Sequence, residues 1–215
     1  MEIYSTEEQQ EEAIKKFIKE NGMQVVFGAV LGLAGFSGWN WYVDSKISAQ
    51  EAASADFENY LEVTSAETVK ADVVDKELNE FVAAHGETGY AIFANLIAAK
   101  KFVENNELAK AEEMLQAASK ATTEPSLSAL VKTRLARVQI AQEKFDVALA
   151  TLNTIKQEAF VARVEEIKGD AYMAQGQQDQ ARQAYQVAAD KGGLDGNNVL
   201  KMKLQDLAQS INTAS

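Results

Sequence analysis

A run of 21 residues without a formal charge, Met23–Val43, constrains the fold of this chain more than any other feature. A helix of that length is about 31 Å long, which matches the hydrocarbon core of a bilayer. Trp39, Trp41 and Tyr42 lie at its far end, where amphipathic rings favour the membrane–water interface. We therefore predict a single transmembrane helix at residues 23–43.

A buried soluble helix and a cleaved signal peptide are the two alternatives to a membrane span. Soluble helices rarely remain uncharged over such a length. The apolar region of a signal peptide is usually about 7–15 residues long and follows a short basic head. Here a mostly acidic segment, residues 1–22, precedes a longer apolar run, so we expect an anchor that is retained.

Lysines on the two sides of the apolar run predict its orientation. Lys15, Lys16 and Lys19 precede it, whereas Lys46 alone follows closely. Because cytoplasmic flanks carry the excess of lysine and arginine, we expect a cytoplasmic N-terminus. The rest of the chain would then face the periplasm of a Gram-negative cell, as in a type II protein of the inner membrane.

Glycines inside the apolar run suggest a contact face for another membrane helix. Gly28 and Gly32 form a GxxxG pattern, and Gly35 follows at helical spacing. Small residues on one face allow two membrane helices to approach closely. Glycine is also common in membrane helices in general, so a plain anchor is the alternative.

Composition predicts an all-α fold with no catalytic or nucleic-acid function. One proline in 215 residues and abundant alanine favour long helices. The net charge of −11 opposes binding to phosphate backbones. No cysteine is present, and the single histidine, His85, stands at an expected helix end before Gly86. We expect no cofactor, metal site or enzyme; the acid pairs Glu112-Glu113 and Glu165-Glu166 are typical of a solvated helix face.

Three stretches of the C-terminal half repeat one pattern: Ala98–Ala118, Leu135–Ile155 and Lys168–Ala188. Each has a small residue, an alanine twelve positions later and a large apolar residue four positions after that. In order, these are Ala99, Ala111 and Leu115; Ala136, Ala148 and Leu152; and Gly169, Ala181 and Tyr185. This is the tetratricopeptide pattern of paired helices. An unrelated helical bundle is the alternative, since no copy has the early tryptophan.

The predicted layout follows from these signals. Residues 1–22 form a cytoplasmic segment, 23–43 the membrane helix, 44–90 a helical stalk and first helices, 91–191 the repeats, and 192–215 a capping helix and tail. Helices are expected at Ser45–Val63, Val69–Ala84 and Val199–Ile211, and turns at Glu104–Glu107, Gln142–Lys144 and Gln175–Gln178. Pro125 is expected in an enlarged linker between the first two repeats.

The first helix of each tetratricopeptide pair lines a concave face, which suggests a groove for an extended or partly unfolded polypeptide. For each single residue, a place in the core or on plain surface is the alternative. The candidate groove residues are Phe93, Leu96, Lys100, Val103, Leu130, Thr133, Arg137, Ile140, Arg163, Glu166, Asp170 and Met173.

Nearly the whole chain resembles the YfgM family, the ancillary subunits of the SecYEG translocon in γ-proteobacterial inner membranes. The resemblance rests on the MEIY start, the EAIKKFIKENG segment, GWNWY at the end of the anchor and RLARVQIAQEKFDVALATLNTIK in the second repeat. It implies association with SecYEG and with the periplasmic chaperone PpiD, and a role in passing newly exported proteins to periplasmic chaperones. The alternative is an envelope-stress regulator or assembly scaffold acting through the acidic tail, Met1–Gly22.

Overall fold

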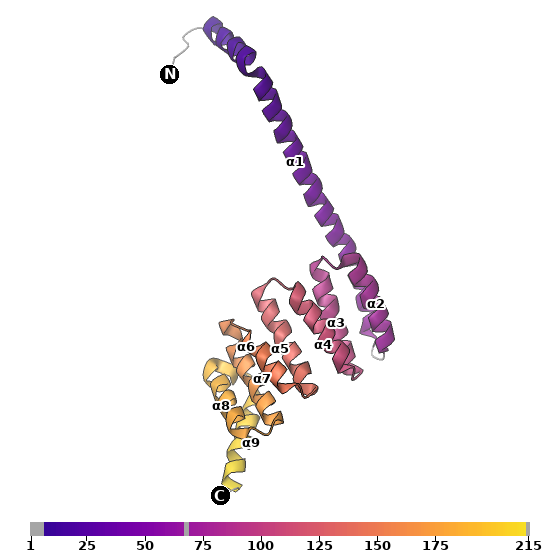
Figure 1. Ribbon diagram of the computed structural model, residues 1–215, viewed down its shortest axis with the longest axis vertical. Coiled ribbons are helices and arrows are strands. Elements are labelled where there is room, and N and C mark those ends of the chain that lie inside the picture. The colour runs from indigo at the N-terminus through magenta and orange to yellow at the C-terminus, as the bar shows by residue number, and fades with distance from the viewer. Residues whose placement is uncertain (1–6, 67–68, 214–215) are drawn as a thin grey trace. The chain divides into compact units, whose positions relative to one another are not determined.

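The computed structural model describes residues 7–66 and 69–213, and all regular secondary structure within these residues is helical (Figure 1). The chain divides into two units, Met1–Ala52 and Ala53–Ser215. Helix α1, Glu7–Ser65, supplies the described part of the first unit and the first residues of the second.

The first unit contains the predicted membrane helix as part of α1. Within the described residues, the segment Gln10–Ser65 is long and apolar enough to cross a membrane, and no residue of its most apolar window is buried. Leu31, Phe36 and Trp39 are 57–66% exposed. Apolar side chains without protein cover fit a helix that is surrounded by lipid.

The second unit is built from antiparallel helix pairs. Helices α3/α4, α5/α6 and α7/α8 form the three predicted hairpins, which confirms the repeats. The helices are α2 Ala71–His85, α3 Gly89–Glu104, α4 Leu108–Ala121, α5 Pro125–Ala141, α6 Phe145–Asn153, α7 Val161–Ala174, α8 Gln178–Ala188 and α9 Asn198–Thr213, with short helices η1 Glu158–Phe160 and η2 Ala189–Gly193.

The same turn ends the first helix of each hairpin. Asn106, Glu143 and Gly176 have positive φ values of 60°, 60° and 75°. The amide of the following residue then donates to the carbonyl five positions back, as in the Schellman motif that satisfies helix-end carbonyls. These bonds are Glu107 N to Phe102 O at 2.7 Å, Lys144 N to Gln139 O at 2.9 Å and Gln177 N to Tyr172 O at 2.8 Å.

The small residues of the repeats mark close helix crossings. Ala99 and Ala136 are 2% and 0% exposed and pack near Leu115 and Leu152 in their hairpins. In the third hairpin the large residue is Tyr185, and its ring atoms lie 2.3–2.9 Å from where a Cβ on Gly169 would stand. A tyrosine at this position therefore requires glycine opposite it.

Pro125 corrects the prediction of an enlarged linker. It is the first residue of α5, and the connection from α4 is Thr122–Glu124 alone. The Glu124 carboxylate accepts hydrogen bonds from the amides of Ser126, at 2.8 Å, and Leu127. Proline suits the first helical position because its missing N–H would have no intrahelical partner there.

The last helix covers the end of the solenoid. Leu200 and Leu207 of α9 are 0% and 3% exposed and pack with Ala181, Tyr185 and Ala188 of α8. Terminal repeats need such a cover because their apolar face has no further neighbour. The fold is thus all-α, with a long apolar N-terminal helix followed by a tetratricopeptide-like solenoid and a C-terminal capping helix.

At the other end of the solenoid, the last turns of α1 and helix α2 close the apolar core. The Tyr60 hydroxyl donates to the carbonyl of Ala94 at 3.1 Å. Phe57 lies 5.8 Å from Phe81, ring centroid to ring centroid. His85 is the last residue of α2, as expected, and its Nε2 lies 2.7 Å from Oδ2 of Asp56. These contacts attach the C-terminal part of α1 to α2 and α3.

Candidate interaction surface

Two adjoining pockets form a groove along helices α3 and α5. The first has a volume of about 440 Å³ and lies over the apolar side chains of Leu96, Ala99, Val103, Leu115 and Val138. The second, of about 340 Å³, extends the surface toward the end of α1 and is lined by Phe57, Leu61, Phe93, Ile97, Leu127 and Leu130. Leu96, Lys100 and Arg134 line both pockets. We call this continuous surface the α3–α5 groove.

Helical spacing explains why α3 presents these side chains together. Phe93, Leu96, Lys100 and Val103 recur at intervals of three or four residues and therefore share one face. Phe93 and Val103 remain 46% and 43% exposed. Large apolar side chains that stay half exposed on one face are typical of a binding surface rather than of a core.

Positive charge borders the apolar floor of the groove. Lys100, Arg134 and Arg137 line it, with Glu104 as the single acid. Glu104 is shared between two lysines, since its carboxylate lies 3.6 Å from Lys100 Nζ and 3.2 Å from Lys101 Nζ. The groove is thus locally cationic in a chain whose net charge is −11.

The structure brings six of the twelve predicted groove residues together. Thr133 is instead 2% exposed and donates to the carbonyl of Leu130 at 2.7 Å, and Ile140 packs against the core between the second and third hairpins. Arg163 and Met173 are exposed on α7 but line neither pocket. The six groove residues are Phe93, Leu96, Lys100, Val103, Leu130 and Arg137.

Glu166 and Asp170, the remaining two, hold the capping helix. Lys203 of α9 places its Nζ 3.0 Å from Glu166 Oε1 and 2.6 Å from Asp170 Oδ1. Asn197 donates to Glu166 Oε2 at 2.9 Å, and the Tyr185 hydroxyl donates to Asp170 Oδ1 at 2.7 Å. These carboxylates are therefore already engaged within the protein.

Among the groove residues that sequence reasoning missed are Leu127, Arg134, Phe57 and Leu61. Leu127 and Arg134 lie on the same face of α5 as Leu130, three positions before and four after it, so helical spacing alone was sufficient to find them. Phe57 and Leu61 carry no such signal, because their place depends on how the end of α1 packs on α3.

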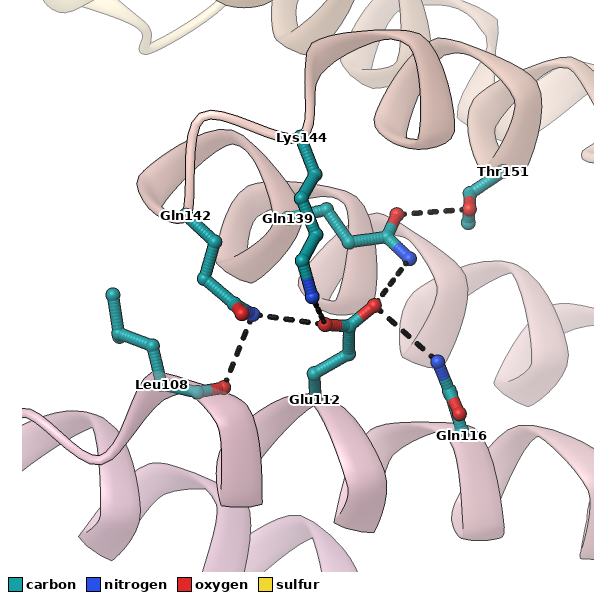
Figure 2. Close-up of polar contacts among 7 residues, drawn as sticks. All are labelled: Leu108, Glu112, Gln116, Gln139, Gln142, Lys144 and Thr151. Atoms are coloured by element: carbon teal, nitrogen blue, oxygen red, sulfur yellow. Dashed lines mark hydrogen bonds and ion pairs between the residues drawn. The ribbon is translucent and has the colours of Figure 1, made fainter.

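A buried carboxylate joins the first hairpin to the second (Figure 2). Glu112 of α4 is 8% exposed, so the prediction that it belongs to a solvated face was wrong. Its carboxylate lies 2.6 Å from Lys144 Nζ and accepts hydrogen bonds at 3.0 Å from both Gln139 and Gln142. Gln139 continues the chain of contacts to Thr151 of α6, whose hydroxyl donates to it at 2.9 Å.

The surroundings of Glu112 determine its charge. Burial alone would raise the pKa of this carboxyl, but hydrogen bonds from Lys144, Gln139 and Gln142 outweigh burial and hold the pKa below its usual range. Glu112 is thus an ionised group that contacts α5 and the α5–α6 turn. Since a half-satisfied buried charge is costly, this network favours one fixed arrangement of the two hairpins.

The described residues include no cluster of three or more histidine or acidic side chains that can hold a metal ion. The groove itself offers apolar contact and guanidinium or ammonium donors. Such a surface is suited to binding a ligand with apolar and anionic groups.

The glycines of the membrane segment lie on open helix surface. Apart from the adjacent residues and the helix's own nearby backbone, no atom of the described residues lies within 4 Å of a Cβ built at Gly28, Gly32 or Gly35. Larger side chains would fit there without a clash inside the protein. Their use as a contact face remains a prediction.

The family and its relatives agree with this architecture. A family model described as a tetratricopeptide repeat-like domain matches residues 15–209. No solved structure matches the chain significantly.

Several curated relatives share nearly their whole length with this chain, and each is called an ancillary SecYEG translocon subunit. The protein from Escherichia coli K12 is 34% identical over 97% of this chain and 100% of its own length. The Haemophilus influenzae protein is 34% identical over 95% of this chain and 99% of its own length. The Neisseria gonorrhoeae protein is 29% identical over 94% of this chain and 97% of its own length. Together with the apolar helix and the stacked hairpins, this similarity shows that the chain belongs to the YfgM family of tetratricopeptide repeat-like ancillary SecYEG translocon subunits.

Proposed function

We propose that this protein is a non-enzymatic subunit of the inner membrane that associates with the SecYEG translocon. In this role it binds segments of newly exported polypeptides in the α3–α5 groove and helps pass them to periplasmic chaperones such as PpiD. The observation that carries the proposal is the similarity of the whole chain to relatives named as translocon subunits.

The groove supports the binding part of this proposal. An exported chain that has not yet folded exposes apolar side chains, and the floor of the groove is apolar over two adjoining pockets. Phe93 and Val103 are exposed enough to contact such a segment directly. A surface of this kind gains affinity from burying apolar area on both partners.

The orientation of the chain is part of the proposal. The groove can meet exported polypeptides only if the hairpins face the periplasm, which requires a cytoplasmic N-terminus. Since the chain contains no cysteine, single-cysteine variants report topology without background. A membrane-impermeant maleimide should label Gln205→Cys in spheroplasts, and Gln10→Cys only after the membrane is permeabilised. The reverse pattern refutes the orientation.

Photocrosslinking in cells tests what the groove contacts. A photoreactive amino acid at Val103 should crosslink to translocating polypeptides, with SecYEG or PpiD recovered in the same complexes. Val187 of α8 is a matched control, because it is a valine of similar exposure, 41% against 43%, that lies outside the groove. Equal crosslinking from both positions, or none from Val103, contradicts the proposal.

The glycine face and the N-terminal segment can be tested by recovering partners in mild detergent. If Gly28, Gly32 and Gly35 contact a helix of SecYEG or PpiD, changing all three to leucine should remove that partner. If the partner set is unchanged, the helix is only an anchor. Should deletion of residues 2–20 reproduce the null phenotype while the Val103 crosslinks persist, the acidic tail carries the function instead.

A further inference from the structure

We propose that the α3–α5 groove selects polypeptide segments in which acidic side chains stand between apolar ones. This inference rests on the proposed function and specifies the class of segment that the same site takes. It follows from two arginines of α5 that line the groove, Arg134 and Arg137.

Arg134 and Arg137 are not engaged by the part of the chain that the structure describes. Both side chains are exposed, and among the described residues neither has a hydrogen-bonding or ion-pair partner. Several other cations of the chain pair with acids: Lys110, for example, lies 3.2 Å from Asp75 and 3.0 Å from Glu107. The single acid of the groove, Glu104, is taken by Lys100 and Lys101.

Charge complementarity therefore favours a ligand that carries carboxylates beside these arginines. The two arginines are three residues apart on one helix face, so their guanidinium groups can reach the same ligand segment. Arginine presents its donors in a planar fork that matches a carboxylate with two parallel hydrogen bonds. A neutral apolar segment would leave both cations without a partner beside it.

The position of Arg134 favours a ligand that carries its carboxylates in its interior. Arg134 lines both pockets, and each pocket is lined mainly by apolar side chains. A fatty acid has one carboxylate at the end of its chain and cannot place apolar groups on both sides of it. A polypeptide with aspartate or glutamate between apolar residues can do so.

Peptide binding to the full chain in detergent micelles tests this inference. The probe is an apolar peptide of about a dozen residues with two glutamates three positions apart, blocked ends and a zwitterionic fluorophore. Matched peptides carry glutamine or lysine at the same two positions. We expect the glutamate peptide to bind about 5- to 30-fold more tightly than the glutamine peptide, since two partly exposed charge pairs contribute about 0.5–1 kcal/mol each.

Variants of the groove arginines give the control. In the double variant R134Q/R137Q the preference should fall below about twofold, and in about 0.5 M salt it should shrink for the wild type as well. R163Q is the matched control, because Arg163 is an exposed arginine of α7 that lines neither pocket. R134E/R137E should reverse the preference toward the lysine peptide, a result that a folding defect cannot produce.

The outcomes separate this inference from the proposed function. If the wild type binds the glutamate and glutamine peptides equally, the selection for acids is wrong, while the groove still binds polypeptide. A preference for the lysine peptide overturns the inference in the same way. If no peptide binds but a dodecanoate probe does, the ligand is not a polypeptide and both proposals fail. Binding of no probe, together with no crosslink from Val103, also overturns both.

Discussion

Gly169→Ala tests whether the third hairpin depends on a contact too close for any side chain. The added Cβ would stand 2.3 Å, 2.4 Å and 2.9 Å from Cε1, Cδ1 and Cζ of Tyr185, whereas carbon atoms are comfortable at about 3.5–4.0 Å. The ring must therefore move by about 1 Å. It cannot move freely, because its hydroxyl donates to Asp170 at 2.7 Å and Lys203 Nζ lies 5.5 Å from its centroid.

Two opposing effects set the size of the change. Overpacking a core costs about 1–3 kcal/mol, and the fixed ring places this site at the upper end. Alanine in place of glycine inside a helix returns about 1 kcal/mol. The net loss of unfolding free energy is about 2 kcal/mol, which corresponds to a fall in Tm of about 4–8 °C for a domain of this size.

Thermal melting of the full chain in detergent, followed by far-UV circular dichroism, measures the effect. The informative comparison is a double-mutant cycle with Tyr185→Leu, because the other two hairpins combine Leu115 or Leu152 with an alanine. In the leucine background Gly169→Ala should raise the Tm, by about 1–4 °C, since only the gain in helix propensity remains. If Gly169→Ala is neutral or stabilising when Tyr185 is present, the close contact does not govern this position.

Three further sets of substitutions probe other features of the fold. Glu112→Gln removes the buried carboxylate that pairs with Lys144 and should lower the unfolding free energy by about 1–3 kcal/mol. The control Glu113→Gln, on the exposed side of α4, should change the unfolding free energy by less than about 0.5 kcal/mol. Because the pKa of Glu112 is lowered in the folded protein, its contribution to the unfolding free energy is present above the ordinary carboxyl pKa and is lost as the pH falls through the folded value. The Tm difference between wild type and Glu112→Gln should therefore shrink on going from pH 7 to about pH 3. A difference that grows contradicts the assignment. Lys203→Gln breaks the two ion pairs that Lys203 makes with α7. The amides of α9 should then exchange with deuterium faster than in the wild type, and this increase should exceed any change in α3. Lys201→Gln, at an exposed position of the same helix, should leave exchange unchanged. Glu143 has a φ of 60°, which favours glycine, so Glu143→Gly should stabilise the chain by about 0.5–1 kcal/mol. Gly176 has a φ of 75°, so Gly176→Ala should destabilise the chain by a similar amount. Melting curves that are unchanged in both variants would show that these turns adapt to either residue.

The sequence predicts the hairpins because their signals are local. The two small residues of each copy are twelve positions apart. The turns fall at Asn106, Glu143 and Gly176 as expected. The capping helix was predicted within one or two residues of its bounds, Asn198–Thr213. Helix periodicity and turn residues depend on nearest neighbours along the chain, so one sequence suffices to find them.

Contacts between hairpins lie beyond this kind of reasoning. Glu112 follows Ala111 directly and is adjacent to the exposed Glu113, so its sequence context is that of a solvated face. It is buried because Gln139, Gln142 and Lys144, about thirty residues later, converge on it. Likewise, nothing near Glu166 or Asp170 in the sequence indicates Lys203 as a partner. These residues are explained only by the stacking of one hairpin on another.

The common turn at the end of α3, α5 and α7 has a consequence for how this protein family can change. Because that turn fixes one end of each helix, differences in helix length accumulate at the other end. Helix α5 begins eighteen residues before its turn residue, and α7 begins fifteen before its own. The additional residues of α5, about 4.5 Å of helix, include Leu127, which lines the second pocket. An insertion of three or four residues ahead of a first helix adds nearly one full turn, so it returns the following side chains to the same face and leaves the hairpin crossing intact. Insertions at this point can therefore lengthen the ligand surface in steps of one helical turn, and the length of segment that is recognised can evolve without any change in the core.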